Sequence, residues 1–143
     1  MSEITYREAL RQALSEKMEG DPRVLILGED VGAYGGAYSV TRGLQEQFGP
    51  ERVRETPIAE SAIVGTAVGA AMAGMRPVAE IMTINFSLLA MDQIVNHAAK
   101  FHYMFAGKIR VPMVLRTVSG WGQLGATHSQ TFENWFASVP GLK

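Results

Sequence analysis

The chain has 143 residues, with 13 basic and 14 acidic side chains and a formal net charge of −1. This length corresponds to one domain, and the balanced charge gives no electrostatic footprint for nucleic acid or an anionic membrane. Hydrophobic residues make up 47% of the chain, enough for a packed core, but no apolar run is long enough to cross a bilayer. There is no cysteine, which excludes disulfides, thiolate zinc sites and thiol nucleophiles. Since the N-terminus shows no signal or transit pattern, the reducing cytoplasm is the expected compartment.

The first part of the chain predicts two helices and two strands. Thr5, followed three residues later by Glu8, forms the capping box of a helix that ends near residue 20. The uninterrupted apolar run from Val24 to Leu27 is typical of a strand buried on both faces, as in a parallel sheet. A short helix carrying Leu44 and Phe48 follows, and a second strand contains Val53.

The remaining elements continue this alternation of strands and helices. We expect a helix of small residues from Glu60 to about residue 74, a strand at 77–81, a long helix at about 86–105 and a strand at 111–117. On the long helix, helical spacing predicts a common face made of Leu88, Met91, Val95 and Ala98. A short amphipathic segment at 132–136 closes the chain. This order predicts an α/β fold with a largely parallel sheet flanked by helices.

The small-residue helix carries a second signal. Gly65 and Gly69 are four residues apart, so they share one side of the helix and leave room for another backbone. We expect this side to form a contact between subunits.

A glycine-rich loop at 120–125 matches the pattern GxGxxG and follows a strand, as in dinucleotide-binding proteins. The match is weak, because no helix clearly opens at Gly125 and no acidic residue is available about 20 positions further on. A flexible loop lining a cleft is the favoured interpretation, and a nicotinamide dehydrogenase is the alternative.

Three acidic residues are candidates for a site. Glu60 has almost entirely apolar neighbours, so it is either an acid favoured by the dipole of the first helical turn or a partly buried carboxylate with a raised pKa. Glu29 and Asp30 follow a buried strand, where open α/β sheets bind ligands, although solvated loop acids are the simpler interpretation.

Histidines and apolar residues give weaker signals. His128 lies among polar residues after the glycine-rich loop, where it is equally suited to acid/base chemistry and to a polar surface. His97 and His102 are five residues apart on the long helix, do not share a metal-binding face and are expected to be structural. Met82 and Phe86 are expected to belong to the core.

Five motifs taken together resemble one family. They are Gly28-Glu29-Asp30-Val31-Gly32, Thr56-Pro57-Ile58-Ala59-Glu60, the segment 68–77, Asp92-Gln93-Ile94-Val95-Asn96 and His128-Ser129-Gln130. In this order they resemble the β-subunit of thiamine-diphosphate-dependent 2-oxoacid dehydrogenases over residues 4–143. Transketolases share the fold expected for such a chain, but the segment 56–60 does not follow their pattern.

The resemblance implies a transketolase-like pyrimidine-binding domain. Glu60 matches the family's glutamate that hydrogen-bonds a ring nitrogen of the aminopyrimidine of thiamine diphosphate. In such enzymes this carboxyl stabilises the imino tautomer, which makes the exocyclic nitrogen basic enough to deprotonate the thiazolium carbon. The cofactor then acts on a 2-oxoacid, and we expect pyruvate, with branched-chain 2-oxoacids or acetoin left open.

The resemblance also assigns roles to other residues. Met82 and Phe86 match positions that pack on the aminopyrimidine, and Ile58 lies next to it. His128 matches an active-site histidine thought to stabilise charge on the substrate adduct and to assist acyl transfer to a lipoyl group. Glu29 matches an acid in a polar tunnel that joins two active sites.

The implied enzyme extends beyond this chain. Residues 1–143 correspond to a pyrimidine-binding domain that is incomplete at its C-terminus, with the C-terminal transketolase-like domain absent. The expected assembly has two α-subunits and two β-subunits, and the α-subunit mainly holds Mg²⁺ and the diphosphate. A lipoyl domain and the core of the dihydrolipoyl acyltransferase are further expected partners. Some family members bind K⁺ through main-chain carbonyls, of which one would match Met113.

A second class of function is a binding module that keeps the fold without chemistry. The presence of both Glu60 and His128 argues against it for the parent protein. The chain by itself is nevertheless expected to be inactive.

Overall fold

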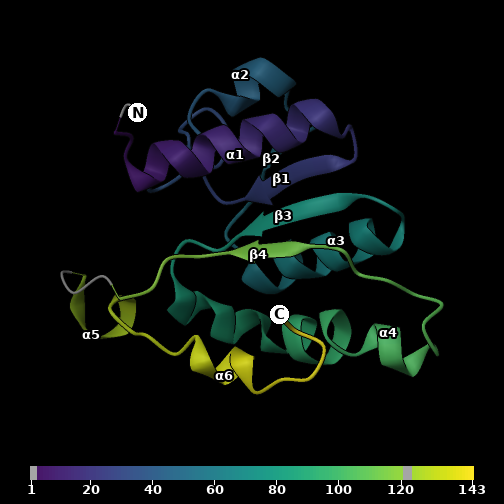
Figure 1. Cartoon of the computed structure of the whole chain (residues 1–143). Coiled ribbons are helices and arrows are strands. Elements are labelled where there is room, and N and C mark those ends of the chain that lie inside the picture. The colour runs from purple at the N-terminus through teal and green to yellow at the C-terminus, as the bar shows by residue number, and fades with distance from the viewer. Residues whose placement is uncertain (1–2, 121–123) are drawn as a thin grey trace.

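A computed structural model describes residues 3–120 and 124–143. Its centre is a four-stranded sheet in the order β2-β1-β3-β4, in which every neighbouring pair is parallel. The strands are β1 (Val24–Gly28), β2 (Val53–Glu55), β3 (Arg76–Glu80) and β4 (Val114–Arg116). In Figure 1 the arrows for β1, β3 and β4 point the same way. The predicted α/β fold with a parallel sheet is confirmed.

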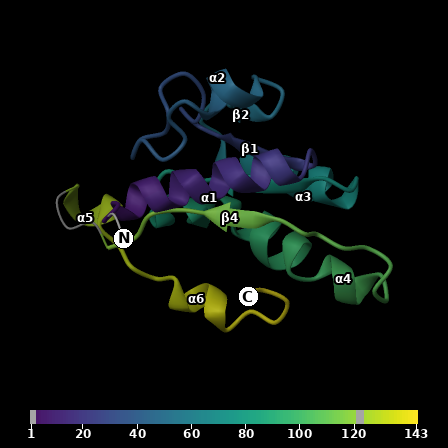
Figure 2. The same cartoon turned by 45° about the horizontal axis from the view of Figure 1, so that its top comes forward.

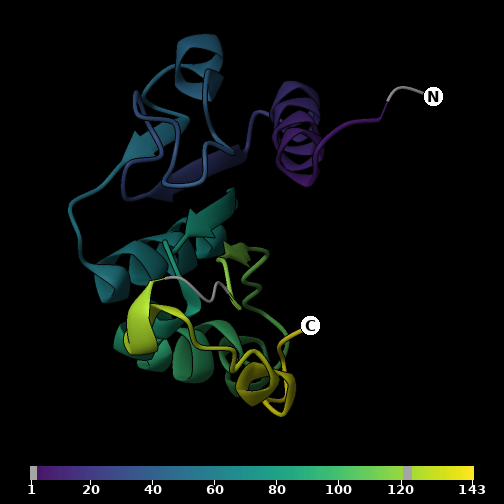
Figure 3. The same cartoon turned by 90° about the vertical axis from the view of Figure 1, so that its left-hand side faces the viewer.

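Helices cover both faces of this sheet. They are α1 (Tyr6–Gly20), α2 (Leu44–Phe48), α3 (Glu60–Met72), α4 (Phe101–Met104), α5 (Gly125–His128) and α6 (Asn134–Ala137), together with a 3₁₀ segment η1 (Ile84–Ala90) and a π-helical segment η2 (Gln93–Ala98). Figure 3 shows α1 and α2 on one side of the sheet and α3 on the other, with η1 and η2 forming a further layer beyond α3. Figure 2 shows α6 on the side of the molecule away from α2.

The central strand β1 explains why both faces need cover, because all five of its residues are buried. Val24 and Ile26 pack into one cluster with Met18 of α1 and Leu44 of α2. The alternate residues Leu25 and Leu27 pack against α3 through Ile63 and Ala67. This alternation is the period of two of a β-strand, and it makes the apolar run a two-sided core strand.

Local signals define the first helix. The side chain of Thr5 accepts a hydrogen bond from the backbone N–H of Glu8, and the Glu8 carboxylate accepts one from the backbone N–H of Thr5 at 2.9 Å. The predicted capping box is therefore confirmed. It satisfies two of the backbone donors that a helix start leaves free.

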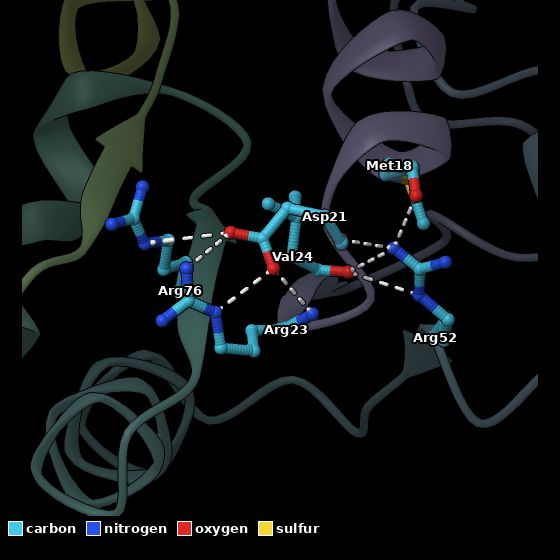
Figure 4. A network of polar contacts seen from close by, with 6 residues as sticks. All are labelled: Met18, Asp21, Arg23, Val24, Arg52 and Arg76. Atoms are coloured by element: carbon cyan, nitrogen blue, oxygen red, sulfur yellow. Dashed lines mark hydrogen bonds and ion pairs between the residues drawn. The ribbon is translucent and has the colours of Figure 1, made fainter.

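A single arginine joins the end of α1 to the start of β1. Arg52 donates hydrogen bonds to the carbonyl oxygens of Met18, Asp21 and Val24 at 2.7–2.9 Å (Figure 4). These carbonyls lie in the last turn of α1, in the turn that follows it and at the first residue of β1. Acceptors at a helix end lack helical partners. The connection before β2 thus fixes the angle at which the chain passes from α1 into the sheet.

The predicted long helix at 86–105 is wrong in its regularity and in its buried face. The segment runs as η1, then η2, then α4, and its buried residues in η1 and η2 are Ile84, Ser87, Ala90 and Ile94. Leu88, which was placed on the predicted face, is 43% exposed. A 3₁₀ turn has three residues, so positions 84, 87 and 90 line up, and the π turn then resets the phase. The Ser87 hydroxyl donates to the Ile84 carbonyl within this turn.

Strand bounds also differ slightly from the prediction. β4 begins at Val114 because Pro112, which has no N–H, lies within the predicted run. β3 begins and ends one residue earlier than predicted. Within residues 3–120 and 124–143, no helix has the length and apolar character needed to cross a membrane.

Candidate functional site

The predicted site residues follow the carboxyl ends of the strands. Glu29 comes directly after β1, Glu60 follows β2, Met82 follows β3, and His128 lies beyond β4. Because the strands are parallel, these ends share one edge of the sheet, and in Figure 1 the chain passes from the tip of β4 to α5 on that side. Open α/β sheets bind their ligands at this edge.

Glu60 is the first residue of α3 and is 6% exposed. The chain reaches it from β2 through Thr56, whose N–H donates to the carbonyl of Gly28 at the end of β1. Among the described residues no donor hydrogen-bonds the Glu60 carboxylate. The predicted position of Glu60 as an acid in the first turn of a helix is therefore confirmed, and the residue is largely buried.

An open cleft of about 850 Å³ runs beside Glu60 along α3. Its walls include Ile58, Gly65, Leu89 and Gln93. Ile58 is 72% exposed, so its apolar side chain is presented to this cleft and not to the core. The cleft combines an apolar wall with one carboxylate, which is the composition of a site for a small ring with polar edges.

Glu29 lies within electrostatic range of the carboxylates of Asp30 and Glu60. Partial burial raises the pKa of Glu29, and the negative charges of Asp30 and Glu60 raise it further. Asp30 adopts a left-handed backbone with φ of 56°, which few residues other than glycine tolerate and in which aspartate is enriched. Its carbonyl accepts a hydrogen bond from the N–H of Gly36. The sequence predicted Glu29 as a strand-end acid, which the family resemblance matches to a tunnel between active sites, and the structure adds a raised pKa.

A second group at this edge consists of Phe86 and His128. Their ring centroids lie 5.1 Å apart with the planes at 83°, an edge-to-face contact. Nδ1 of His128 lies 2.9 Å from the hydroxyl oxygen of Thr127. Met82 and Phe86 are half-buried, so neither is a core residue in the full sense predicted.

Met113, the predicted K⁺ ligand, lies apart from these residues. It precedes β4 and is therefore at the amino edge of the sheet, where its side chain packs against the clusters around α3. A carbonyl site for K⁺ there stays a prediction. In the part of the chain that the structure describes, no three His, Asp or Glu side chains gather as a metal site.

The two helical histidines have structural partners, as expected. Nδ1 of His97 lies 2.7 Å from the side-chain oxygen of Gln93, and Nδ1 of His102 lies 2.9 Å from the carbonyl oxygen of Ile109. These contacts hold the helical segment and the loop that follows α4.

The glycine-rich loop gives no support to nucleotide binding. Residues 121–123 of this loop lie outside the described residues. Contrary to expectation, a helix does open at Gly125, but α5 has only four residues.

No sequence pattern pointed to an ion pair that lies on the other face of the sheet near the same edge. Arg116 of β4 and Glu80 of β3 are in register, and their side chains lie 2.6 Å apart. Gly28 of β1 occupies the same row, and a Cβ atom there would come within 2.7 Å of the Glu80 carbonyl oxygen. Alternate residues of a strand lie on the same face, so the sequence could have placed Glu80 on the face of Val78. The residue that pairs with Glu80 depends on the register between strands, which the sequence does not show.

The family model described as "Transketolase, pyrimidine binding domain" matches residues 2–143. The chain belongs to this family. The beta4 tetramer of an inactive split-gene transketolase has the same fold as this pyrimidine-binding domain, with a TM-score of 0.64 and 24% identity over 90% of this chain and 37% of that one.

Closer relatives of the pyrimidine-binding domain are pyruvate dehydrogenase E1 component beta subunits. The mitochondrial subunit beta-1 of Arabidopsis thaliana is 54% identical over 99% of this chain and 39% of its own length. The subunit beta of Rickettsia bellii is 53% identical over 99% of this chain and 44% of its own length. The chain therefore spans about two fifths of the length of these curated relatives.

Proposed function

We propose that this pyrimidine-binding domain is part of the β-subunit of a pyruvate dehydrogenase E1 component. In this function it binds the aminopyrimidine of thiamine diphosphate in an enzyme that decarboxylates pyruvate and transfers the acetyl group to lipoyl. The observation that carries the proposal is the buried Glu60 carboxylate, which lies beside an open cleft without a donor from the described residues. The names of the relatives, each an E1 beta subunit, support the choice of reaction.

The residues of the cleft fit the aminopyrimidine. A carboxyl group at a helix start can share a proton with a ring nitrogen, and the exposed Ile58 offers an apolar surface to the ring. In the proposed division of the site, the α-subunit mainly holds Mg²⁺ and the diphosphate.

When bound, thiamine diphosphate supplies the electron sink for decarboxylation of a 2-oxoacid. Glu60 would hold the proton at the pyrimidine ring nitrogen, and the residue is only 6% exposed, so a ring that fills the adjoining cleft would cover the rest of it. Met82, Phe86 and Ile58 orient the ring by packing. Phe86 also contacts His128, so one aromatic side chain links the cofactor surface to the histidine.

Two further residues have separate roles in this proposal. His128 acts on the substrate, and Glu29 acts on a proton path. His128 would stabilise negative charge that develops on the substrate and would assist acyl transfer. Glu29 has a raised pKa, so its carboxyl holds a proton more readily than an ordinary glutamate and suits a proton path to a second active site.

The partners, a further ion and the compartment belong to the same proposal. The domain assembles with an α-subunit and a second β-subunit in a heterotetramer. This tetramer acts with a lipoyl domain and the dihydrolipoyl acyltransferase core. K⁺ at the Met113 carbonyl is a further proposed ligand. The proposed compartment is the cytoplasm, while the plant relatives carry mitochondrial or chloroplastic names.

The test is reconstitution of a full-length β-subunit containing this domain with its α-subunit. Thiamine-diphosphate-dependent release of CO₂ should be faster from pyruvate than from branched-chain 2-oxoacids, and acetoin should not be cleaved. The 143-residue chain with cofactor alone should release none, since it supplies only part of the site. Thiamine-diphosphate-independent turnover, or a preference for another substrate, would contradict the proposed reaction.

A further inference from the structure

The three histidines of the chain differ in what their Nδ1 atoms contact. Nδ1 of His102 faces a backbone carbonyl oxygen, and Nδ1 of His97 faces the amide oxygen of Gln93. A carbonyl oxygen only accepts hydrogen bonds, so Nδ1 carries the hydrogen in both residues. Nδ1 of His128 instead faces the hydroxyl of Thr127, which can donate or accept.

The His128 ring is held on a second side. Its edge-to-face contact with Phe86, with centroids 5.1 Å apart, opposes rotation of the imidazole away from Thr127. Within residues 3–120 and 124–143, no hydrogen-bond partner contacts Nε2. One ring nitrogen thus contacts a neighbour in the chain, and the other has no partner among the described residues.

We propose that Thr127 is a positioning residue that sets the tautomer of His128. Its hydroxyl donates to Nδ1, which leaves the hydrogen of the neutral imidazole on Nε2. His128 then presents an N–H donor to the site. The tautomer is a property of this chain alone, whereas its use in catalysis rests on the proposed function.

The chemical consequence follows from the direction of the hydrogen bond. A neutral imidazole with hydrogen on Nε2 can stabilise a developing negative charge on a substrate oxygen by hydrogen bonding. It gives up no proton in doing so. When His128 is protonated, both nitrogens donate and the Thr127 hydroxyl can turn to accept, so the same contact serves both charge states.

The tautomer can be measured on the 143-residue chain by long-range ¹H–¹⁵N NMR of the imidazoles. The pH should lie about 1.5 units above the ordinary histidine pKa of about 6.5, so that neutral rings dominate. His102 provides an internal reference for hydrogen on Nδ1. We expect His128 to show the opposite pattern, with hydrogen on Nε2, in the wild type and in Thr127→Ser.

Thr127→Val keeps the shape of the side chain but removes the hydroxyl. In this variant the fraction of neutral His128 with hydrogen on Nε2 should fall to the fraction found in a solvated histidine peptide measured alongside. Hydrogen on Nδ1 of His128 in the wild type, or identical populations in the wild type and Thr127→Val, would overturn the assignment. Unchanged His97 and His102 signals would show that the fold is intact.

Kinetics of the assembled enzyme test whether the tautomer matters. Thr127→Val should lower kcat about tenfold with little change in the KM for thiamine diphosphate, by analogy with metal-site histidines, where loss of an orienting partner costs about 10- to 100-fold. Thr127→Ser should restore the rate. A tautomer change without a change in kcat would overturn the positioning role, and absence of wild-type activity would contradict the proposed function while leaving the NMR result valid.

Discussion

The Glu80 carboxylate and the Arg116 guanidinium join β3 to β4 at a separation of 2.6 Å, with side chains only 6% and 15% exposed. The loop that follows β1 covers the pair at Gly36. A Cβ atom added to this glycine would lie 3.4 Å from Oε1 of Glu80. Each of these two buried charges is stabilised by the other, so removal of one leaves the other buried without compensation. We therefore expect the stability of the fold to depend on the pair being intact.

Glu80→Gln should destabilise the chain by about 3 kcal/mol, because it leaves the guanidinium buried without a compensating charge. Replacement of both partners, Glu80→Leu with Arg116→Met, should cost much less. Urea unfolding of the 143-residue chain measures both. Arg54→Gln, at an exposed ion pair with Glu51, is the matched control and should cause no measurable change. If Glu80→Gln lowered the free energy of unfolding no more than Arg54→Gln does, the charges of Glu80 and Arg116 would not stabilise each other.

Asp21 should make folding depend on pH at the acid end. Hydrogen bonds from Arg23 lower the pKa of Asp21 from 3.8 to about 2 (Figure 4). Because the folded pKa is the lower one, this carboxylate stabilises the fold above about pH 3.8, and the contribution is lost as the pH falls to about 2. The difference in Tm between the wild type and Asp21→Asn should be constant near neutrality and vanish over this window.

The matched control for Asp21 is Glu3→Gln, which removes an exposed acid near the N-terminus. Its Tm difference from the wild type should show no comparable change between pH 3.8 and 2. A difference for Asp21→Asn that persists unchanged to pH 2 would mean that the Arg23 contact does not lower the pKa in solution.

Gly69→Leu should separate folding from assembly. A Cβ atom at Gly69 meets nothing within 4 Å, so the larger side chain fits the domain by itself. Leucine also favours a helix more than glycine does, by roughly 0.5–1 kcal/mol. The 143-residue chain should therefore be as stable as the wild type or more so, while a full-length β-subunit should fail to form a tetramer on size-exclusion chromatography. Normal tetramer elution would rule out α3 as a subunit contact.

Glu60→Gln tests the proton held at the pyrimidine. Glutamine keeps the size of the side chain but cannot share an acidic proton, so cofactor binding should weaken modestly. Deuterium exchange at the thiazolium carbon of the bound cofactor should slow by about 10²-fold or more in the assembled enzyme. Glu29→Gln is the matched control, because it removes a neighbouring carboxyl that is not expected to touch the ring, and its effect should be smaller. Wild-type exchange in Glu60→Gln would remove Glu60 from the mechanism.

The elements that the sequence predicted well are those defined by local signals. The capping box of Thr5 and Glu8 and the apolar run of β1 depend only on neighbouring residues, and both are confirmed. The segment containing η1 and η2 differs because its helical phase is set by packing against α3. Regular spacing cannot reveal a change from three to more than four residues per turn.

The same distinction applies to the site. Glu29 and Glu60 could be placed at one edge because parallel strands bring their carboxyl ends together. The contact of Phe86 with His128 joins segments more than 40 residues apart in the chain, and no periodic pattern connects them. The pair of Glu80 and Arg116 required knowledge of the register between β3 and β4.

The hydrogen bonds of Arg52 have a consequence for local unfolding. An N-terminal helix ordinarily frays and exchanges its amide hydrogens early, independently of the sheet. Here the last turn of α1 and the first residue of β1 share one guanidinium with the connection before β2. These three segments should therefore open as one cooperative unit, with amide protection at the end of α1 as high as that in β1, while the first turn of α1 exchanges on its own.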